Sequence, residues 1–142
     1  MPPASLFVSY SSRDRDRVVP LVEQLRKAGL PVWLDQTDIG AGAEWSGEII
    51  AGLDASQVVL VCLSHSSVVS EEVFREVAYA ASARKRFLPV RLEPIELPGR
   101  LRYFLSAIHF VDLFGSAAEA RASALPELLR QLLSSTPPAE PG

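Results

Sequence analysis

The feature that most constrains the fold is a run of six consecutive apolar residues at 58–63, Val-Val-Leu-Val-Cys-Leu. A strand that is apolar at every position has no face to offer to water, so both of its faces must be covered. Strands of this kind lie at the centre of parallel sheets, where helices pack on both sides. We therefore expect residues 58–63 to form a central parallel strand.

Strands and helices alternate along the rest of the 142-residue chain. Short apolar runs predict four further strands, at residues 6–8, 31–35, 87–92 and 107–112. Apolar stripes and capping residues predict helices that begin near Asp14 or Asp16, at Glu44, at Ser70 and at Ala117. This order predicts an α/β fold, a flavodoxin-like open sheet of five parallel strands with helices on both faces.

Two segments depart from this regular pattern. Pro89 lies within the expected strand 87–92, and because proline has no backbone N–H, we expect a bulge or a strand end there. Residues 93–106 have no clear helical stripe, so we expect any helix in that segment to be short or absent.

The length is that of one domain, which we expect to span residues 1–133. Residues 134–142 read Ser-Ser-Thr-Pro-Pro-Ala-Glu-Pro-Gly, which predicts a Pro-rich tail or a linker to another module. A single cysteine, Cys62, allows no disulfide within the chain and is expected to be a buried small hydrophobe. Neither a signal peptide nor a membrane-spanning run of apolar residues is recognisable, so we expect a cytoplasmic protein without membrane contact.

Several classes of site do not fit the sequence. The net charge of −3 and the lack of a basic cluster argue against direct nucleic-acid binding. The two histidines are far apart in sequence, which argues against a metal cluster. Neither a P-loop nor a GxGxxG fingerprint occurs, and there is no GxSxG elbow for a serine hydrolase.

In an open parallel sheet, ligands bind beyond the carboxyl ends of the strands, near the point where the strand order reverses. The residues expected at those ends form a polar set: Ser9, Tyr10, Ser11, Ser12, Asp35, Ser64, His65, Arg91, Glu93 and Asp112. His65 on such a loop is one candidate for a general base, with a plain surface role as the alternative.

Four segments of the chain resemble the signature boxes of TIR (Toll/interleukin-1 receptor) domains, those of bacteria in particular. The segments are Leu-Phe-Val-Ser-Tyr-Ser at 6–11, Val-Trp-Leu-Asp at 32–35 with Ile-Gly-Ala-Gly-Ala-Glu-Trp at 39–45, Ser-Glu-Glu-Val-Phe-Arg-Glu-Val at 70–77, and Phe-Leu-Pro-Val at 87–90. Their order and spacing are similar to those of the family, and the resemblance covers about residues 5–133.

Many TIR domains that resemble this chain hydrolyse or cyclise NAD⁺, and the resemblance places their catalytic glutamate at Glu76. On a helical wheel, Glu76 lies roughly 100° from the middle of the apolar stripe, at its boundary, beside the small residues Ala80 and Ala83. A carboxylate there is able to stabilise the oxocarbenium-like ribose that forms when nicotinamide leaves. The resemblance implies NAD⁺ as a substrate and no cofactor; a solvated helix glutamate is the alternative interpretation.

The residues that follow the first strand are candidates for binding NAD⁺. Tyr10 is placed to stack on a ring of the dinucleotide or, alternatively, to pack in the core. Ser11 and Ser12 are candidates for hydrogen bonds to phosphate or ribose, and serines in such turns also serve as helix caps.

Four further residues complete the set of candidates. Asp35 is a candidate for binding a hydroxyl group or for capping its loop. Gly42 and Trp45 belong to the loop and helix start that the family calls the BB loop, where Trp45 either covers the pocket or joins the core. Glu72 stands one turn before Glu76, where similar enzymes often carry tryptophan; the two carboxylates repel each other unless Glu72 faces water.

The resemblance supports two functional hypotheses. The first is an NAD⁺ glycohydrolase or ADP-ribosyl cyclase whose copies assemble through the BB loop, Gln36 to Trp45, under a fused or associated sensor module. Similar domains are effectors of bacterial antiphage immune signalling. The second is a non-enzymatic module for homotypic assembly. Two departures from the pattern of similar enzymes leave it open: Glu72 replaces an aromatic residue, and the first basic residue is Arg13 instead of a residue directly after Tyr10. The sequence does not separate hydrolysis from cyclisation.

Overall fold

The computed structural model describes residues 5–34, 47–106, 108 and 110–134. Five strands form one sheet in the order β2-β1-β3-β4-β5, and every neighbouring pair is parallel. The strands are β1 (Leu6–Ser9), β2 (Val32–Leu34), β3 (Val58–Leu63), β4 (Arg86–Arg91) and β5 (Val111–Asp112). The predicted five-stranded parallel sheet of flavodoxin-like order is therefore confirmed.

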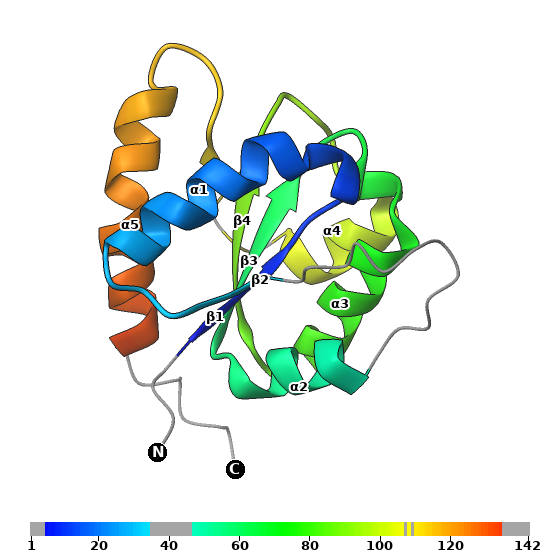
Figure 1. Ribbon diagram of the computed structural model, residues 1–142. Helices are drawn as coiled ribbons and strands as arrows, with labels where there is room; N and C mark the ends of the chain where they lie inside the picture. The colour runs from blue at the N-terminus through cyan, green and yellow to red at the C-terminus, as the bar shows by residue number, and fades with distance from the viewer. Residues whose placement is uncertain (1–4, 35–46, 107, 109, 135–142) are drawn as a thin grey trace.

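Helices cover both faces of this sheet (Figure 1). On one side lie α1 (Arg15–Lys27) and α5 (Ala118–Ser134); on the other lie α2 (Gly47–Ala55), α3 (Glu71–Ser82) and α4 (Gly99–Leu105). Two short 3-10 helices, η1 (Ser12–Asp14) and η2 (Ser67–Val69), precede α1 and α3. Among the described residues, no helix is long and apolar enough to cross a membrane.

The strand β3 is fully buried at all six positions, as its sequence predicts. Its side chains alternate between two separate cores: Val58, Leu60 and Cys62 pack toward α1 and α5, while Val59, Val61 and Leu63 pack toward α2, α3 and α4. Cys62 is a buried thiol, and burial together with the nearby charge of Asp14 raises its pKa to about 12. The thiol is therefore protonated at neutral pH and acts as a small hydrophobe.

The prediction of a bulge or a strand end at Pro89 is wrong. β4 pairs with β3 without interruption, and Pro89 lies opposite Val61. The backbone N–H groups of Arg86 and Leu92 donate to the carbonyl oxygens of Gln57 and Leu63. The backbone N–H groups of even-numbered residues in β4 therefore point toward β3, and those of odd-numbered residues point toward β5. The strand β5 pairs with β4 only at Val90 and Arg91, so Pro89 has no partner residue in β5. The missing N–H of proline therefore removes no bond from the ladder.

The last strand is shorter than the sequence predicts. Residues 107–112 were expected to form it, but of the described residues in that range only Val111 and Asp112 belong to β5. Within residues 93–106, where any helix was expected to be short or absent, the short helix α4 is present, with Leu101 and Leu105 buried. Two buried leucines are too few to give a long helical stripe, which explains the weak signal in the sequence.

A close contact joins the edge strand β2 to the helix α2. The Trp33 indole stacks on the Phe7 ring, with centroids 5.1 Å apart and an angle of 12° between the planes. Gly52 of α2 lies against the same indole, and a Cβ placed there would come within 2.6 Å of Trp33 Cδ2 and Cε2. The absence of a side chain at Gly52 is what allows α2 to approach the sheet this closely.

We expect Gly52→Ala to lower the free energy of unfolding by about 1–3 kcal/mol, because Trp33 must move to admit the new methyl group. The matched control is Gly99→Ala at the first residue of α4, where an added Cβ meets nothing within 4 Å. Urea denaturation of both variants tests this, and equal stabilities for the two would contradict it.

Candidate functional site

The strand order reverses between β1 and β3. β1 continues through α1 to β2 on one side, whereas β3 continues through α3 to β4 on the other. The loops that leave the carboxyl ends of these two strands therefore diverge, and a crevice between such loops is the usual ligand site of this architecture. The polar residues that follow β1 and β3 accordingly define the candidate site.

The helix α3 directs a carboxylate at this edge of the sheet. It begins after Ser70, whose hydroxyl accepts a hydrogen bond from the Val73 N–H at 3.2 Å. The buried residues of α3 are Val73, Glu76, Val77 and Ala80, one continuous stripe along the helix. Glu76 is only 3% exposed, so the buried face of α3 extends to the stripe boundary, where the helical wheel places this residue.

Ser9, the last residue of β1, binds this carboxylate directly. Its hydroxyl donates a hydrogen bond of 2.7 Å to Glu76 Oε1 across a sequence separation of 67 residues, and Ser9 has no exposed surface. Ser9 is expected at the strand end from the sequence, but it is not among the predicted binding residues. Strand alternation was the available signal, since Ser9 lies two residues after Phe7, which packs toward α3.

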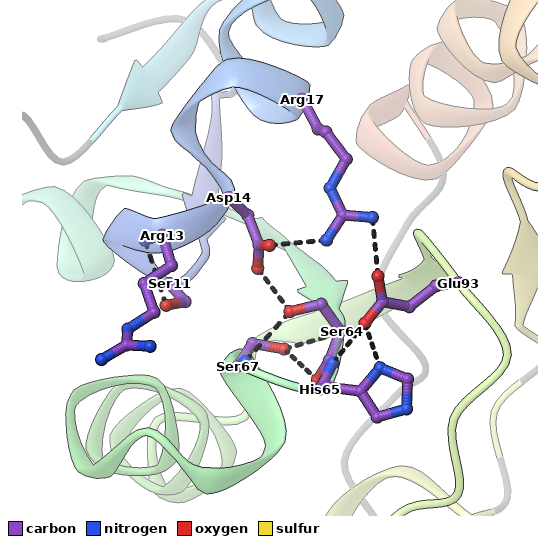
Figure 2. Close-up of polar contacts among 8 residues, drawn as sticks. All are labelled: Ser11, Arg13, Asp14, Arg17, Ser64, His65, Ser67 and Glu93. Carbon is purple, nitrogen blue, oxygen red and sulfur yellow. Dashed lines mark hydrogen bonds and ion pairs between the residues drawn. The ribbon is translucent and has the colours of Figure 1, made fainter.

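A second polar cluster lies on the α1 side of the sheet (Figure 2). Asp14 is 4% exposed, and its carboxylate accepts hydrogen bonds from the Ser64 hydroxyl and from Arg17 Nη2, the latter at 2.6 Å. Ser64 and Ser67 bind each other through backbone and hydroxyl groups at 2.8 and 3.0 Å. Asp14 occupies the predicted N-cap position of α1, but its side chain makes no cap bond there. It joins the turn after β1 to the turn after β3 instead.

Glu93, just beyond β4, extends this cluster (Figure 2). Its carboxylate accepts hydrogen bonds from the backbone N–H of His65 and from Arg17 Nη1, both at 2.8 Å, and it also binds His65 Nδ1. The His65 N–H and the Arg17 guanidinium together lower the pKa of Glu93 to about 2. Glu93 therefore carries its charge throughout the neutral range and holds one nitrogen of the His65 ring.

The other predicted binding residues differ in their burial and contacts. Tyr10 is partly buried and packs against the core on the α1 side, and Ser11 caps η1 by accepting the Arg13 N–H at 3.3 Å. Ser12 is exposed in η1, and Glu72 is exposed on α3 one turn before Glu76. Asp35, Gly42, Trp45 and the rest of the BB loop segment 36–45 lie outside the described residues.

Two other features of the sheet edge lie apart from Ser9 and Glu76. Arg91 binds Asp112 through two hydrogen bonds of 2.6 and 2.8 Å, lowers the pKa of Asp112, and lies near the rings of Phe110 and Phe114. An open groove of about 500 Å³ separates β5 from α5, at the far edge of the sheet from β1 and β2. Of the described residues, no group of three or more His, Cys, Asp or Glu is placed to hold a metal ion.

Comparison with known proteins gives matches in sequence and in structure. The family model described as TIR domain matches residues 6–129. The 2' cyclic ADP-D-ribose synthase AbTIR of Acinetobacter baumannii (strain 1295743) is 32% identical over 94 residues, which are 63% of this chain and 35% of that protein. The chain thus spans about a third of the length of this relative.

Solved TIR domains have the same fold. The TIR domain of the Toll-related receptor TRR-2 from Hydra magnipapillata superposes with a TM-score of 0.70 at 20% identity, over 89% of this chain and 96% of that one. A chain of the RPS4 and RRS1 TIR domain heterodimer superposes with a TM-score of 0.67 at 15% identity, over 93% and 99%. At these identities the likeness concerns the fold alone.

The environment of Glu93 predicts a pH-dependent contribution to stability. Because its pKa is about 2 in the folded chain against an ordinary value of 4.5, the carboxylate stabilises the fold above about pH 4.5, and this contribution is lost as the pH falls toward 2. We expect Glu93→Gln to lower the free energy of unfolding by about 1–2 kcal/mol at pH 7, a range reduced because the side chain is 25% exposed.

Denaturant titrations between pH 2 and pH 7 measure this difference. The gap between wild type and Glu93→Gln should narrow steadily below about pH 4.5. Glu96→Gln, which alters an exposed glutamate of the same loop, is the control. A gap that is constant over the whole pH range would contradict the assigned environment of Glu93.

Proposed function

Because the chain belongs to the TIR domain family, we propose that it cleaves NAD⁺ to nicotinamide and either ADP-ribose or a cyclic isomer when its copies assemble. The observation that carries this proposal is the buried Glu76 carboxylate, hydrogen-bonded to Ser9 where the strand order reverses. The name of the 32% identical relative, a 2' cyclic ADP-D-ribose synthase, supports the same class of reaction.

The burial of Glu76 favours a functional role over a structural one. Its neighbours in the α3 stripe are Val73, Val77 and Ala80, and an apolar side chain at position 76 would continue that stripe without the cost of desolvating a carboxylate. Glutamate is among the residues least often fully buried in proteins unless it is paired or functional. A buried carboxylate at the ligand-binding edge of the sheet therefore supports a catalytic role for Glu76.

The reaction requires what such a carboxylate supplies. The bond between ribose C1′ and the nicotinamide nitrogen breaks, and its electron pair neutralises the cationic ring that leaves. Positive charge then develops on the ribose, where a fixed negative charge stabilises it most. Attack by water releases a proton and gives ADP-ribose, whereas attack by a nucleophilic atom of the same molecule gives a cyclic product. NAD⁺ is thus a substrate, and the proposal includes no cofactor.

The remaining binding roles also belong to the proposal. Tyr10, Ser11, Ser12 and Glu72 would contact NAD⁺ from the turn after β1 and from α3. Asp35, Gly42 and Trp45 would contribute from the BB loop, Gln36 to Trp45, which would also join neighbouring copies under a sensor module. We place this activity in the bacterial cytoplasm, in immune signalling.

A non-enzymatic assembly module is the second candidate. The exposure of Glu72 and the capping role of Ser11 favour it, because a solvated carboxylate and a helix cap need no substrate to account for them. Measurement of NAD⁺ turnover separates the two candidates.

The first test of the proposal replaces the carboxylate with its neutral isostere. We expect Glu76→Gln in the assembled protein to release nicotinamide at least about 100-fold more slowly, because the charge that stabilises the ribose cation is lost. Glu23→Gln, on the exposed face of α1, is the control. Oligomeric wild type that releases no nicotinamide from NAD⁺ would refute the enzymatic function, and an unchanged rate for Glu76→Gln would refute the role of this residue.

The second test concerns assembly. If neighbouring copies complete the site, nicotinamide release per chain should rise with protein concentration over the range in which light scattering detects oligomers. Trp45→Ala should shift that rise to higher concentration by weakening the contact. A rate per chain that stays constant through the transition from monomer to oligomer would show that single chains suffice.

A further inference from the structure

We propose that Ser9 is a positioning residue for Glu76, whose hydroxyl fixes the orientation of the carboxylate through its hydrogen bond to Oε1. The inference rests on the proposed function and adds a second residue to the same site. Ser9 would act through Glu76 and not by contact with NAD⁺.

The backbone of Ser9 is held firmly by the sheet. Ser9 is the last residue of β1, opposite Val61 of the central strand, and has no exposed surface. Neighbouring strands hold β1 on both sides, since β2 and β3 flank it in the sheet. The position of the Ser9 hydroxyl is therefore set by the sheet, and side chains on such elements hold a partner more accurately than side chains on loops.

A directional contact is needed to hold a glutamate carboxylate in one orientation. A glutamate side chain has three torsions, the last of which is broad, so its helix fixes the Cα position but not the carboxylate. The hydrogen bond of 2.7 Å from the Ser9 hydroxyl to Oε1 is such a directional contact.

A positioning role and a purely structural role of Ser9 differ in their effect on the reaction rate. Loss of one buried hydrogen bond lowers the free energy of unfolding modestly wherever the bond lies in the fold. A shift of about 1 Å in a catalytic group can lower a rate by about 100-fold. Substitution of Ser9 should therefore affect turnover far more than another buried serine that loses a comparable bond.

The chain offers a matched control in Ser56. Ser56 is also fully buried, and its hydroxyl donates a hydrogen bond of 2.7 Å to the Gly52 carbonyl oxygen. It precedes β3, at the amino edge of the sheet, so it lies at the end opposite to Glu76. Ser9→Ala and Ser56→Ala thus remove equivalent groups from the two edges.

The experiment measures kcat and KM for NAD⁺ cleavage in the assembled full chain, together with Tm. We expect Ser9→Ala to lower kcat by about 10- to 100-fold with KM changed by less than about threefold. Ser9→Thr keeps the hydroxyl, so its kcat should return to within about threefold of wild type even where the added methyl lowers Tm. Ser56→Ala should lower Tm about as much as Ser9→Ala while its kcat stays at the wild-type value.

The other possible outcomes distinguish a failure of the proposed function from a failure of the role of Ser9. Oligomeric wild type without activity removes the proposed function, and the role of Ser9 with it. If wild type cleaves NAD⁺ and Glu76→Gln does not, the function stands, and a wild-type kcat in Ser9→Ala overturns the positioning role alone. An equal loss of kcat in Ser9→Ala and Ser56→Ala, or a rise in KM alone in Ser9→Ala, overturns it as well.

Discussion

The burial of β3 on both faces is the constraint on which the rest of the structure depends. Six apolar side chains that alternate between two cores require helices on both sides of the sheet, and the parallel order follows from the crossovers that those helices make. The same alternation continues at the strand ends. The Ser9 side chain lies on the same face of the sheet as Phe7, toward α3. The Ser64 side chain lies on the same face as Cys62, toward α1. The sheet itself therefore separates the polar residues of its carboxyl edge into two groups.

These two groups contribute in different ways. The members of the group on the α1 side bind one another: Asp14 joins Ser64, and Glu93 joins His65 and Arg17. It ties together the chain segments that leave β1, β3 and β4, so the surroundings of the β1 end are fixed from that side. Among the described residues, the group on the α3 side includes a strand hydroxyl and a helix carboxylate, which lie beside an apolar cluster. A hydrogen-bonded support on one side and a buried carboxyl group on the other is the arrangement expected of a preorganised site.

The sequence predicts most of the fold and less of the site. Runs of apolar residues predict all five strands, because burial in a parallel sheet leaves a direct mark on composition. The expectation at Pro89 fails because the direction of its nitrogen depends on where β5 begins, which the local sequence does not state. Physical reasoning places Glu76 only near a stripe boundary, and its selection relies on resemblance to a family. Ser9 is harder still, since its partner lies 67 residues away.

Burial of the Ser9 and Glu76 pair also costs the fold stability. Both residues lie in the layer between the sheet and α3, where Phe7, Val61, Val73 and Val77 are buried. Apolar residues at both positions would extend this core and remove the cost of burying a carboxylate, and replacement of buried polar pairs by hydrophobic ones is often neutral or stabilising. A chain selected for stability alone would have no use for this pair. Strained or polar groups that cost stability concentrate at functional sites, and here the cost falls at the edge where this architecture binds ligands.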